Sequence, residues 1–526
     1  MRLATLVLLL AACGDDGAKS PDAGAGSDAA PDSIAPCTPA AAGMPAERVS
    51  TTSGTVHGTP GAASFSYLGI PYAAPPTGDL RFASPQAAAC ASSEIDATAY
   101  GPVCPQLDAG GNYSGDEDCL HLNVFAPNAA SAAPVMVFIH GGANVEGSAS
   151  DPLYDGHLLA EAGGVVVVTL DYRLAQLGFL DHPAIAAADM GSGNFGLLDQ
   201  IAALQWVHAN IAGFGGDPSN VTVFGESAGG RDTCSVVAAP ASAGLFAHAI
   251  VESGSCGALP TRAVAQATGN TYASDTGCAT ASDVLACLRS MPAELAIRTD
   301  ASSASILVST LYQPVIDGTV QPVEPIAAMQ AGTHHHVTFM VGSNADETGK
   351  EAPAVPDEST YDTLVTQQFG ATLAPMVLAQ YPVGDFPTPR AAYVRVTTDA
   401  RFVCPTRQIA RAATMGQSEA VYRYFFSYPA TVFGAVHGIE LPYVFGTFSA
   451  LATANGPYTP TDTDLAISAA MQADWAAFAH GGAPTSGWPA YDDTDPARDF
   501  DTTTTTVHGI RTDACDFWQQ LEGSSI

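Results

Sequence analysis

The stretch Phe224-Gly225-Glu226-Ser227-Ala228-Gly229-Gly230 places a serine between two elements of different type. Residues 220–224 before it form a short apolar, β-branched run, which is typical of a buried strand. After it, small residues lead into a segment that can be helical as far as Pro240. Such a Gly-x-Ser-x-Gly joint turns so sharply that glycine is needed two residues on either side of the serine. The joint therefore predicts a nucleophilic Ser227, raised above a sheet at the N-terminus of a helix, rather than an ordinary structural turn.

The charge of the chain limits its partners. Its 526 residues carry a formal net charge of −34, and lysine occurs only at Lys19 and Lys350. Binding to nucleic acid or anionic lipid requires clustered Lys and Arg, so we expect neither as a partner. We interpret the acidity as favouring solubility rather than as a trap for cationic substrates.

Apolar runs alternate with a helical pattern along the chain. We expect strands within residues 49–58, 134–139, 164–170, 220–224, 247–251, 337–341 and 420–426, a helix over 197–211, and an ordered proline-rich loop over 69–76. This alternation predicts an α/β fold with a largely parallel sheet and crossover helices. Because the candidate catalytic residues are scattered over half the chain, we expect one domain with long insertions, over residues 46–522.

The N-terminus has the features of an export signal. Residues 3–12 form an apolar run that suits a signal-peptide core and is too short to span a bilayer. It ends in Leu10-Ala11-Ala12-Cys13, which resembles a bacterial lipobox, so we expect cleavage after residue 12 and lipidation of Cys13. Residues 13–45 contain little bulky apolar material and are predicted to form a disordered tether. These features favour an exported cell-envelope lipoprotein; the alternative is a secreted protein with an ordinary signal peptide.

Several further motifs occur in a fixed order between about residue 50 and residue 520. They are Gly69-Ile70-Pro71-Tyr72, Glu117-Asp118-Cys119-Leu120-His121-Leu122-Asn123-Val124, Phe214-Gly215-Gly216 through Gly229, Pro314-Val315-Ile316-Asp317-Gly318, Leu441-Pro442-Tyr443-Val444-Phe445-Gly446 and Trp488-Pro489-Ala490-Tyr491. Together they resemble the type B carboxylesterase family, which includes cholinesterases and bacterial para-nitrobenzyl esterases. The resemblance implies an α/β-hydrolase fold and hydrolysis of a small-molecule ester.

A serine nucleophile needs a base within hydrogen-bond distance. The α/β-hydrolase order of serine, acid and histidine excludes His140 and His208. His437, in the stretch 435–442, resembles the family's catalytic histidine. The rival cluster His334-His335-His336 suggests a metal site, but consecutive histidines before a strand are more typical of an exposed turn, so we expect no metal and no cofactor.

Two adjacent carboxylates, Asp346 and Glu347, follow a predicted strand, as the orienting acid of a triad should. The residues alone leave both open. The resemblance assigns this role to Glu347.

The tetrahedral intermediate of ester cleavage needs N–H donors for its oxyanion. Gly141, Gly142 and Ala143 at the end of a strand, with Ala228 on the nucleophile helix, are the expected donors. The family usually has a large apolar residue at the position of Asn144, so we expect Asn144 to make the acyl or alcohol pocket more polar or more open. We expect Glu226 in the same pocket.

Arg231 and Asp232 also depart from the family pattern, in which small or hydroxyl residues are usual at these positions. We favour a buried charge pair of Arg231 with Asp232 or Glu226, because buried charges normally occur in pairs. The alternative is that Arg231 binds a carboxylate of the substrate.

Lipidation of Cys13 would leave ten of the eleven cysteines, an even number that suits disulfides in an exported protein. The resemblance implies the pairs Cys104–Cys119, Cys278–Cys287 and Cys404–Cys515. For the remaining four we expect Cys234–Cys256 and Cys37–Cys90, although spacing does not fix their pairing.

The substrate class follows in part from one absence in the sequence. Cholinesterases hold a tryptophan between their first two bridged cysteines, where it stacks on the quaternary ammonium. Residues 105–118 contain no tryptophan, which argues against choline esters. We expect hydrolysis of short- to medium-chain carboxylic esters. The alternatives are a non-catalytic adhesion protein on the same fold, and an amidase or peptidase with the same triad.

Overall fold

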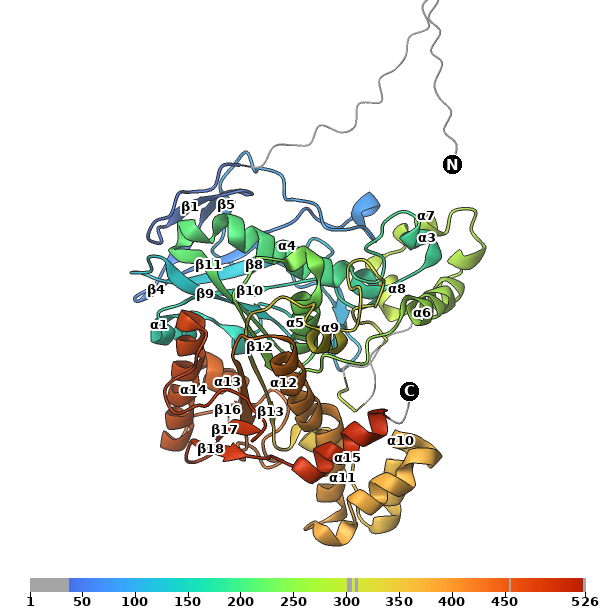
Figure 1. Ribbon diagram of the computed structural model, residues 1–526. Coiled ribbons are helices and arrows are strands. Elements are labelled where there is room, and N and C mark those ends of the chain that lie inside the picture. The colour runs from blue at the N-terminus through green and yellow to red at the C-terminus, as the bar shows by residue number, and fades with distance from the viewer. Residues whose placement is uncertain (1–36, 300–304, 308–310, 454–455, 524–526) are drawn as a thin grey trace, which may run out of the picture. The chain divides into compact units, whose positions relative to one another are not determined.

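A mixed β-sheet with helices on both faces forms the centre of the molecule (Figure 1). The computed structural model describes residues 37–299, 305–307, 311–453 and 456–523. The predicted signal peptide, Cys13 and the tether as far as residue 36 lie outside the described residues. No helix among the described residues is long and apolar enough to cross a membrane.

The strands are mostly short, and the one that leads to Ser227 is the longest. They are β1 Arg48–Thr51, β2 Gly54–His57, β3 Thr59–Pro60, β4 Ser64–Pro71, β5 Ile95–Asp96, β6 Gln106–Leu107, β7 Tyr113–Ser114, β8 His121–Pro127, β9 Ala133–Ile139, β10 Val166–Leu170, β11 Gly216–Glu226, β12 His248–Glu252, β13 Thr338–Asn344, β14 Val421–Phe426, β15 Ala452–Thr453, β16 Gly456–Pro457, β17 Pro496–Phe500 and β18 Thr505–His508.

The helices connect successive strands of the sheet or form excursions between them. They are α1 His157–Gly163, α2 Ala175–Phe179, α3 Pro183–Ala186, α4 Phe195–Asn210, α5 Ala228–Ala238, α6 Arg262–Asp275, α7 Val284–Arg289, α8 Ala293–Arg298, α9 Pro325–Ala331, α10 Glu358–Gln380, α11 Pro389–Thr398, α12 Cys404–Gly416, α13 Leu441–Phe445, α14 Asp462–Gly481 and α15 Thr512–Gly523. A π-helical turn, Asp399–Val403, joins α11 to α12.

The main sheet has the order β18-β17-β14-β13-β12-β11-β9-β10-β8-β4-β3 in the described part of the chain. The central strands β17, β14, β13, β12, β11, β9 and β10 run parallel to one another. Strands β8, β4 and β3 at one edge and β18 at the other are antiparallel to their neighbours. The predicted, largely parallel α/β sheet is therefore confirmed. Since the carboxyl ends of parallel strands lie at one edge, the residues that follow β9, β11, β12 and β13 come close together there.

The two faces of the sheet bury different side chains of each strand, as the two-residue period of a strand requires. On β9, Val135 and Val137 belong to the core cluster that includes α4, α5 and α12. Met136 and Phe138 face the opposite side and pack with α1, α13 and α14. The sheet is thus covered on both faces, which explains why its central strands are apolar throughout.

Two boundaries differ from the expectation. Residues 69–71 belong to β4 rather than to a loop, because a bulge between Tyr67 and Ile70 accommodates the left-handed Gly69 and leaves Pro71 at the strand end. Residues 37–45, expected as tether, lie on the folded domain, where the disulfide Cys37–Cys90 and backbone hydrogen bonds from Ala40 and Gly43 hold them.

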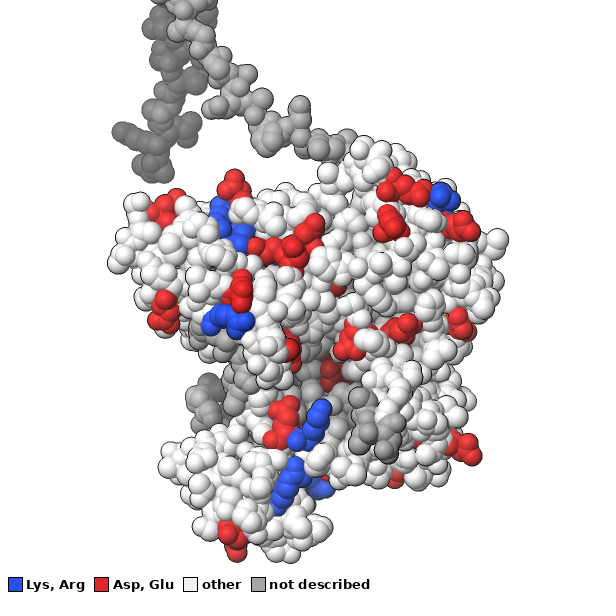
Figure 2. Space-filling model, turned by 180° about the vertical axis from the view of Figure 1, so that it is seen from behind, with Lys and Arg blue, Asp and Glu red and all other residues white. Residues whose placement is uncertain are grey.

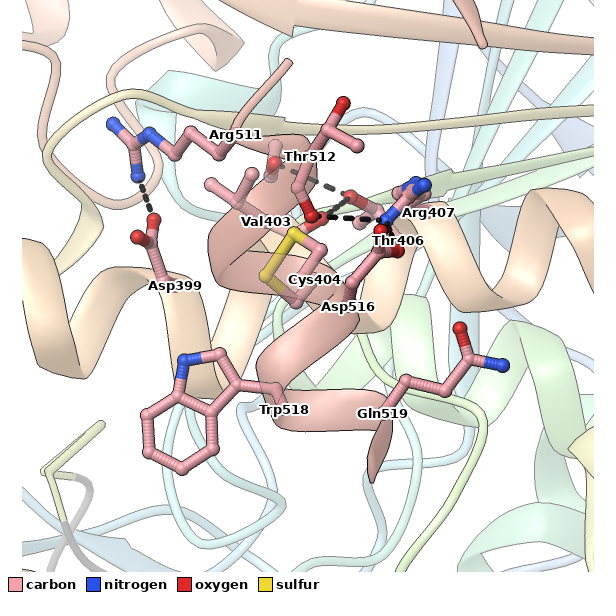
Figure 3. The surroundings of a disulfide bond; sticks show 12 residues. Asp399, Val403, Cys404, Thr406, Arg407, Arg511, Thr512, Asp516, Trp518 and Gln519 are labelled. Carbon is pink, nitrogen blue, oxygen red and sulfur yellow. Dashed lines mark hydrogen bonds and ion pairs between the residues drawn. A yellow bond between two sulfur atoms is a disulfide. The ribbon is translucent and has the colours of Figure 1, made fainter. Parts of the chain in front are cut away.

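The described cysteines form the disulfides that we expected, Cys37–Cys90, Cys104–Cys119, Cys234–Cys256, Cys278–Cys287 and Cys404–Cys515. Figure 3 shows the last of these, which joins α12 to the C-terminal helix α15. An ion pair of Arg407 with Asp516, 2.7 Å long, lies beside it. The bond and the ion pair hold the C-terminal helix against the body of the protein.

Candidate active site

Ser227 stands at the joint between β11 and α5, with φ 60° and ψ −119°. A non-glycine residue in this conformation is strained, and such strain is typical of a nucleophile on a sharp turn. A Cβ on Gly225 would overlap the carbonyl oxygen of Gly229, and a Cβ on Gly229 would overlap that of Ile139. The two glycines are therefore required by sterics, which is why the sequence can make this turn.

The side chains of Ser227, His437 and Glu347 form a continuous chain of contacts. The Oγ of Ser227 lies 2.7 Å from Nε2 of His437. Nδ1 of the same imidazole lies 2.6 Å from Oε2 of Glu347. These residues, spread over more than 200 positions of sequence, meet because they follow β11, β13 and β14 at the same edge of the sheet.

The buried Glu347 carboxylate has further partners that fix its orientation. Its Oε1 accepts a hydrogen bond from Oγ of Ser253 at 2.7 Å and from the backbone N–H of Asn344 at 2.8 Å. Its neighbour Asp346 points elsewhere, since its carboxylate accepts the N–H of Ala435 at 3.3 Å. Of the two adjacent carboxylates, only Glu347 contacts the imidazole.

Two more carboxylates surround the histidine. Oε1 of Glu226 lies 3.3 Å from Nε2 of His437, and Glu440 accepts hydrogen bonds from Ser253 and Asn344. Burial raises the pKa of Glu226 to about 7. Burial alone would lower the pKa of His437, but the carboxylates of Glu226 and Glu347 outweigh it and raise that pKa above its ordinary value. Sequence reasoning missed Glu440, although it lies only three residues after His437.

The expected oxyanion donors lie beside the serine. A Cβ on Gly141 would lie 3.0 Å from Cβ of Ser227, so this loop passes close to the nucleophile. Gly142 and Ala143 adopt positive φ of 103° and 56° in a turn after β9, and Ala143 lines the same cavity as Ser227. Ala228 is the first residue of α5, where backbone N–H groups have no acceptor within the helix.

A cavity of about 520 Å³ opens above the serine. Ala143, Ser227 and Ala228 lie in its wall, together with Arg231 and, from a distant part of the sequence, the segment 400–402. Within that segment, the ring of Phe402 packs against the imidazole of His437, with ring centroids 4.9 Å apart. Nothing in the sequence around Phe402 marks it as an active-site residue.

Glu226 and Asn144, expected as pocket residues, are not among the described residues that line the cavity. Glu226 is buried beside the imidazole. The amide of Asn144 is fully buried, donates to Asp232 at 3.1 Å and accepts from the hydroxyl of Tyr172 at 3.0 Å. Asn144 therefore belongs to an internal polar network rather than to the substrate pocket.

The charge pair that we favoured for Arg231 is not formed. The carboxylate of Asp232 instead accepts hydrogen bonds from Asn144 and Gln200, while Arg231 donates to Gln313 at 2.8 Å. The physical reason is that adjacent residues of a helix do not face each other. Arg231 faces the cavity, and Asp232 faces the core.

The rival histidine cluster does not converge on one point. Nε2 of His334 lies 2.9 Å from the side chain of Gln417, that of His335 lies 2.7 Å from the carbonyl of Ala239, and that of His336 lies 3.1 Å from the carbonyl of Gly332. His334 is buried, which differs from the exposed turn that we expected. Among the described residues, no group of three His, Cys, Asp or Glu side chains is arranged to hold a metal ion.

Comparison with known proteins gives a consistent picture. Residues 45–518 match the carboxylesterase family. The chain is 36% identical over 463 residues to the para-nitrobenzyl esterase of Bacillus subtilis (strain 168), which covers 84% of this chain and 92% of that protein. It is 32% identical over 519 residues to carboxylesterase 1D of Rattus norvegicus, with coverage of 86% and 88%.

Solved structures agree with these relatives. A thermophilic para-nitrobenzyl esterase superposes with a TM-score of 0.78 at 35% identity, covering 90% of this chain and 99% of that one. A carboxylesterase of Geobacillus stearothermophilus gives a TM-score of 0.78 at 31% identity, with coverage of 90% and 100%. The chain thus has the α/β-hydrolase fold, belongs to the carboxylesterase family and is a carboxylic ester hydrolase.

Proposed function

We propose that Ser227 is the nucleophile of a two-step ester hydrolysis, with His437 as general base and acid and Glu347 as the orienting acid. The Oγ of Ser227 attacks the ester carbonyl while its proton passes to Nε2 of His437. The imidazolium then protonates the leaving alcohol, which departs and leaves an acyl-enzyme. Water attacks the acyl group, gives its proton to the same nitrogen, and the acid is released as the serine hydroxyl re-forms.

Within this proposal the backbone N–H groups of Gly142, Ala143 and Ala228 stabilise the oxyanion of each tetrahedral intermediate, with Gly141 allowing the loop to approach the serine. The dipole of α5 adds to them, since its positive end points toward Ser227. Glu347 holds the imidazole so that Nε2 is free to accept the serine proton.

The single observation that supports this function most strongly is the pair of contacts on one imidazole, 2.7 Å to Ser227 and 2.6 Å to Glu347, beside an open cavity. A non-catalytic adhesion protein has no need of this arrangement. We therefore favour an enzyme for small esters with short- to medium-chain acyl groups, which a cavity of about 520 Å³ can admit.

The test is turnover of para-nitrophenyl acetate and butyrate by the wild type, Ser227→Ala and a control, Ser219→Ala. Ser219 is exposed near the start of the same strand, β11, where its hydroxyl and its backbone N–H both donate to the carboxylate of Asp217. We expect loss of turnover only in Ser227→Ala. Turnover retained in that variant would exclude Ser227. Equal rates on a matched ester and anilide would favour an amidase or peptidase instead.

We also propose that the chain is exported and anchored by a lipid on Cys13. This proposal rests on the motif Leu10-Ala11-Ala12-Cys13 and on the disulfides of the described residues, which persist in oxidising compartments. The measurement is mass spectrometry of the mature N-terminus together with membrane fractionation of Cys13→Ser. We expect a diacylglyceryl group on Cys13 and release of the variant from membranes. A mature N-terminus at another residue would exclude the anchor.

A further inference from the structure

Two arginines line the cavity above Ser227. Arg231 lies on α5, and its backbone N–H donates to the carbonyl of Ser227, so it follows the nucleophile by one helical turn. Arg401 lies on the π-helical turn Asp399–Val403, next to Phe402, which contacts His437. The cavity that contains the nucleophile is therefore also lined by two arginines.

Cations are scarce in this chain, which has 18 Lys and Arg against 52 Asp and Glu. The fully buried arginines are neutralised by carboxylates; Arg173, for example, pairs with Asp199 at 2.7 Å, and Arg423 with Asp495 at 2.7 Å. Within the described residues, neither Arg231 nor Arg401 has a carboxylate within 4 Å. Two unpaired arginines in one cavity of so acidic a protein call for a ligand-binding role.

Neutral groups position both guanidinium groups, and most of their N–H donors have no acceptor among the residues that the structure describes. Nη1 of Arg231 donates to Gln313 at 2.8 Å, while its buried Nε has no acceptor among the described residues. Nη2 of Arg401 donates to the carbonyl of Leu307 at 2.8 Å. Because a guanidinium has five donors in a planar fork that matches a carboxylate, an acidic ligand can bind both.

The positive charges of Arg231 and Arg401 also repel each other. Burial lowers the pKa of Arg231, which the neighbouring Asp232 offsets only in part. Burial lowers the pKa of Arg401 as well, and the positive charge of Arg231 adds to this effect. An anion bound between them would relieve both penalties.

One carboxylate, Glu324, shares the cavity wall but does not neutralise the arginines. Its Oε1 accepts the backbone N–H of Leu259 at 3.3 Å, and it forms no ion pair with Arg231 or Arg401. Both guanidinium groups therefore remain without a carboxylate partner among the described residues.

We propose that Arg231 and Arg401 form a subsite for a carboxylate of the substrate, so that the enzyme favours esters that carry a free carboxylate, such as monoesters of dicarboxylic acids. The inference rests on the proposed role of Ser227, because it concerns the same cavity. Acidic side chains are spread over the face shown in Figure 2, and the formal net charge of −34 disfavours the approach of anionic substrates to the protein. The positive charges of Arg231 and Arg401 would offset this repulsion inside the cavity and allow an anionic ester to bind.

The experiment compares kcat/KM for each anionic ester with that for its neutral amide isostere. One pair has the carboxylate on the acyl side, monoethyl adipate and ethyl 6-amino-6-oxohexanoate. The other has it on the alcohol side, 4-acetoxybutanoate and 4-acetoxybutanamide. The variants are Arg231→Gln, Arg231→Lys and Arg401→Gln. The matched control is Arg298→Gln, which removes the same charge from an exposed pair with Glu294.

We expect the ratio of anionic to neutral kcat/KM to fall by about 10- to 100-fold in Arg231→Gln and Arg401→Gln for at least one pair, because each loses a charged hydrogen bond to the ligand. In Arg231→Lys the ratio should fall less than in Arg231→Gln, and in Arg298→Gln it should equal that of the wild type. The concentration of adipate that half-inhibits cleavage of para-nitrophenyl butyrate should rise by a similar factor in the two glutamine variants.

A ratio that falls by less than tenfold in both glutamine variants, for both substrate pairs, would overturn the subsite. Thermal unfolding of each variant shows whether it is folded; if Arg231→Gln is not, Arg401→Gln and Arg231→Lys decide the question. Failure of the proposed function gives a different result. Either the wild type does not turn over neutral para-nitrophenyl esters, or the variant Ser227→Ala still does.

Discussion

Oε1 of Glu226 lies 3.3 Å from Nε2 of His437, the same nitrogen that contacts Ser227. The carboxylate immediately before the nucleophile therefore acts on the base directly. Its negative charge favours the protonated imidazole, so the pKa of His437 lies above its ordinary value even though burial opposes this.

The first prediction concerns the pH dependence of kcat/KM. His437 accepts a proton only when it is neutral, so activity falls as the pH drops below its pKa. Because that pKa is raised, the fall should begin above pH 6.5, the reference value for histidine. In Glu226→Gln the fall should move to lower pH by roughly 1 unit, since one negative charge is removed. A profile that does not move, or moves to higher pH, would contradict this role of Glu226.

The second prediction separates the two adjacent carboxylates. Glu347→Gln should lower kcat by about 10⁴-fold, because the imidazole loses the acid that fixes its tautomer. Asp346→Asn is the matched control, since the Asp346 carboxylate accepts the N–H of Ala435 and has no other hydrogen bond within the described part of the chain. The kcat of Asp346→Asn should stay within about tenfold of the wild-type value. The opposite ranking would show that Asp346 is the orienting acid.

The third prediction tests the steric reason for the turn at Ser227. Gly229→Ala places a Cβ against the carbonyl of Ile139 and should lower the free energy of unfolding by roughly 1–3 kcal/mol and reduce turnover. Gly384→Ala, where a Cβ meets nothing within 4 Å, should change neither. Denaturant unfolding measures both variants. Equal stability of the two would show that the turn tolerates a side chain.

Much of the fold and of the site could be predicted because the signals are local. The apolar runs at β9, β10, β11 and β14 predict a parallel sheet, and the carboxyl ends of such strands meet at one edge. The resemblance carried by the ordered motifs then indicates Ser227, Glu347 and His437. Ser227 and Glu347 each lie within hydrogen-bond distance of the His437 imidazole.

The rest depends on directions and contacts that the sequence does not encode locally. Asn144 was expected in the pocket, but its amide is drawn into the core by Asp232 and Tyr172. The expected pair of Arg231 with Asp232 or Glu226 is not formed, because adjacent helix residues such as Arg231 and Asp232 do not face each other and Glu226 lies beside His437. Phe402 reaches His437 through a π-helical turn that no pattern in the sequence marks.

The fourth prediction compares two disulfides that differ in the length of chain they enclose. Cys404 and Cys515 are 111 residues apart, and Cys278 and Cys287 are 9 apart. The chain-entropy relation gives about 4.8 kcal/mol for the longer loop and about 2.6 kcal/mol for the shorter one. Replacing Cys404 and Cys515 by serine should therefore lower the free energy of unfolding more than replacing Cys278 and Cys287. The reverse order in denaturant unfolding would show that loop length is not the controlling factor.

The most direct test of the central claim is covalent labelling with a fluorophosphonate, which reacts with an activated serine and releases fluoride. Mass spectrometry of the digested protein should find a single adduct, on the peptide that contains Ser227, formed in step with the loss of esterase activity. His437→Ala should react far more slowly, because the hydroxyl loses its base. Complete inactivation with the adduct on any other residue, or full esterase activity in a protein labelled at Ser227, would contradict the account.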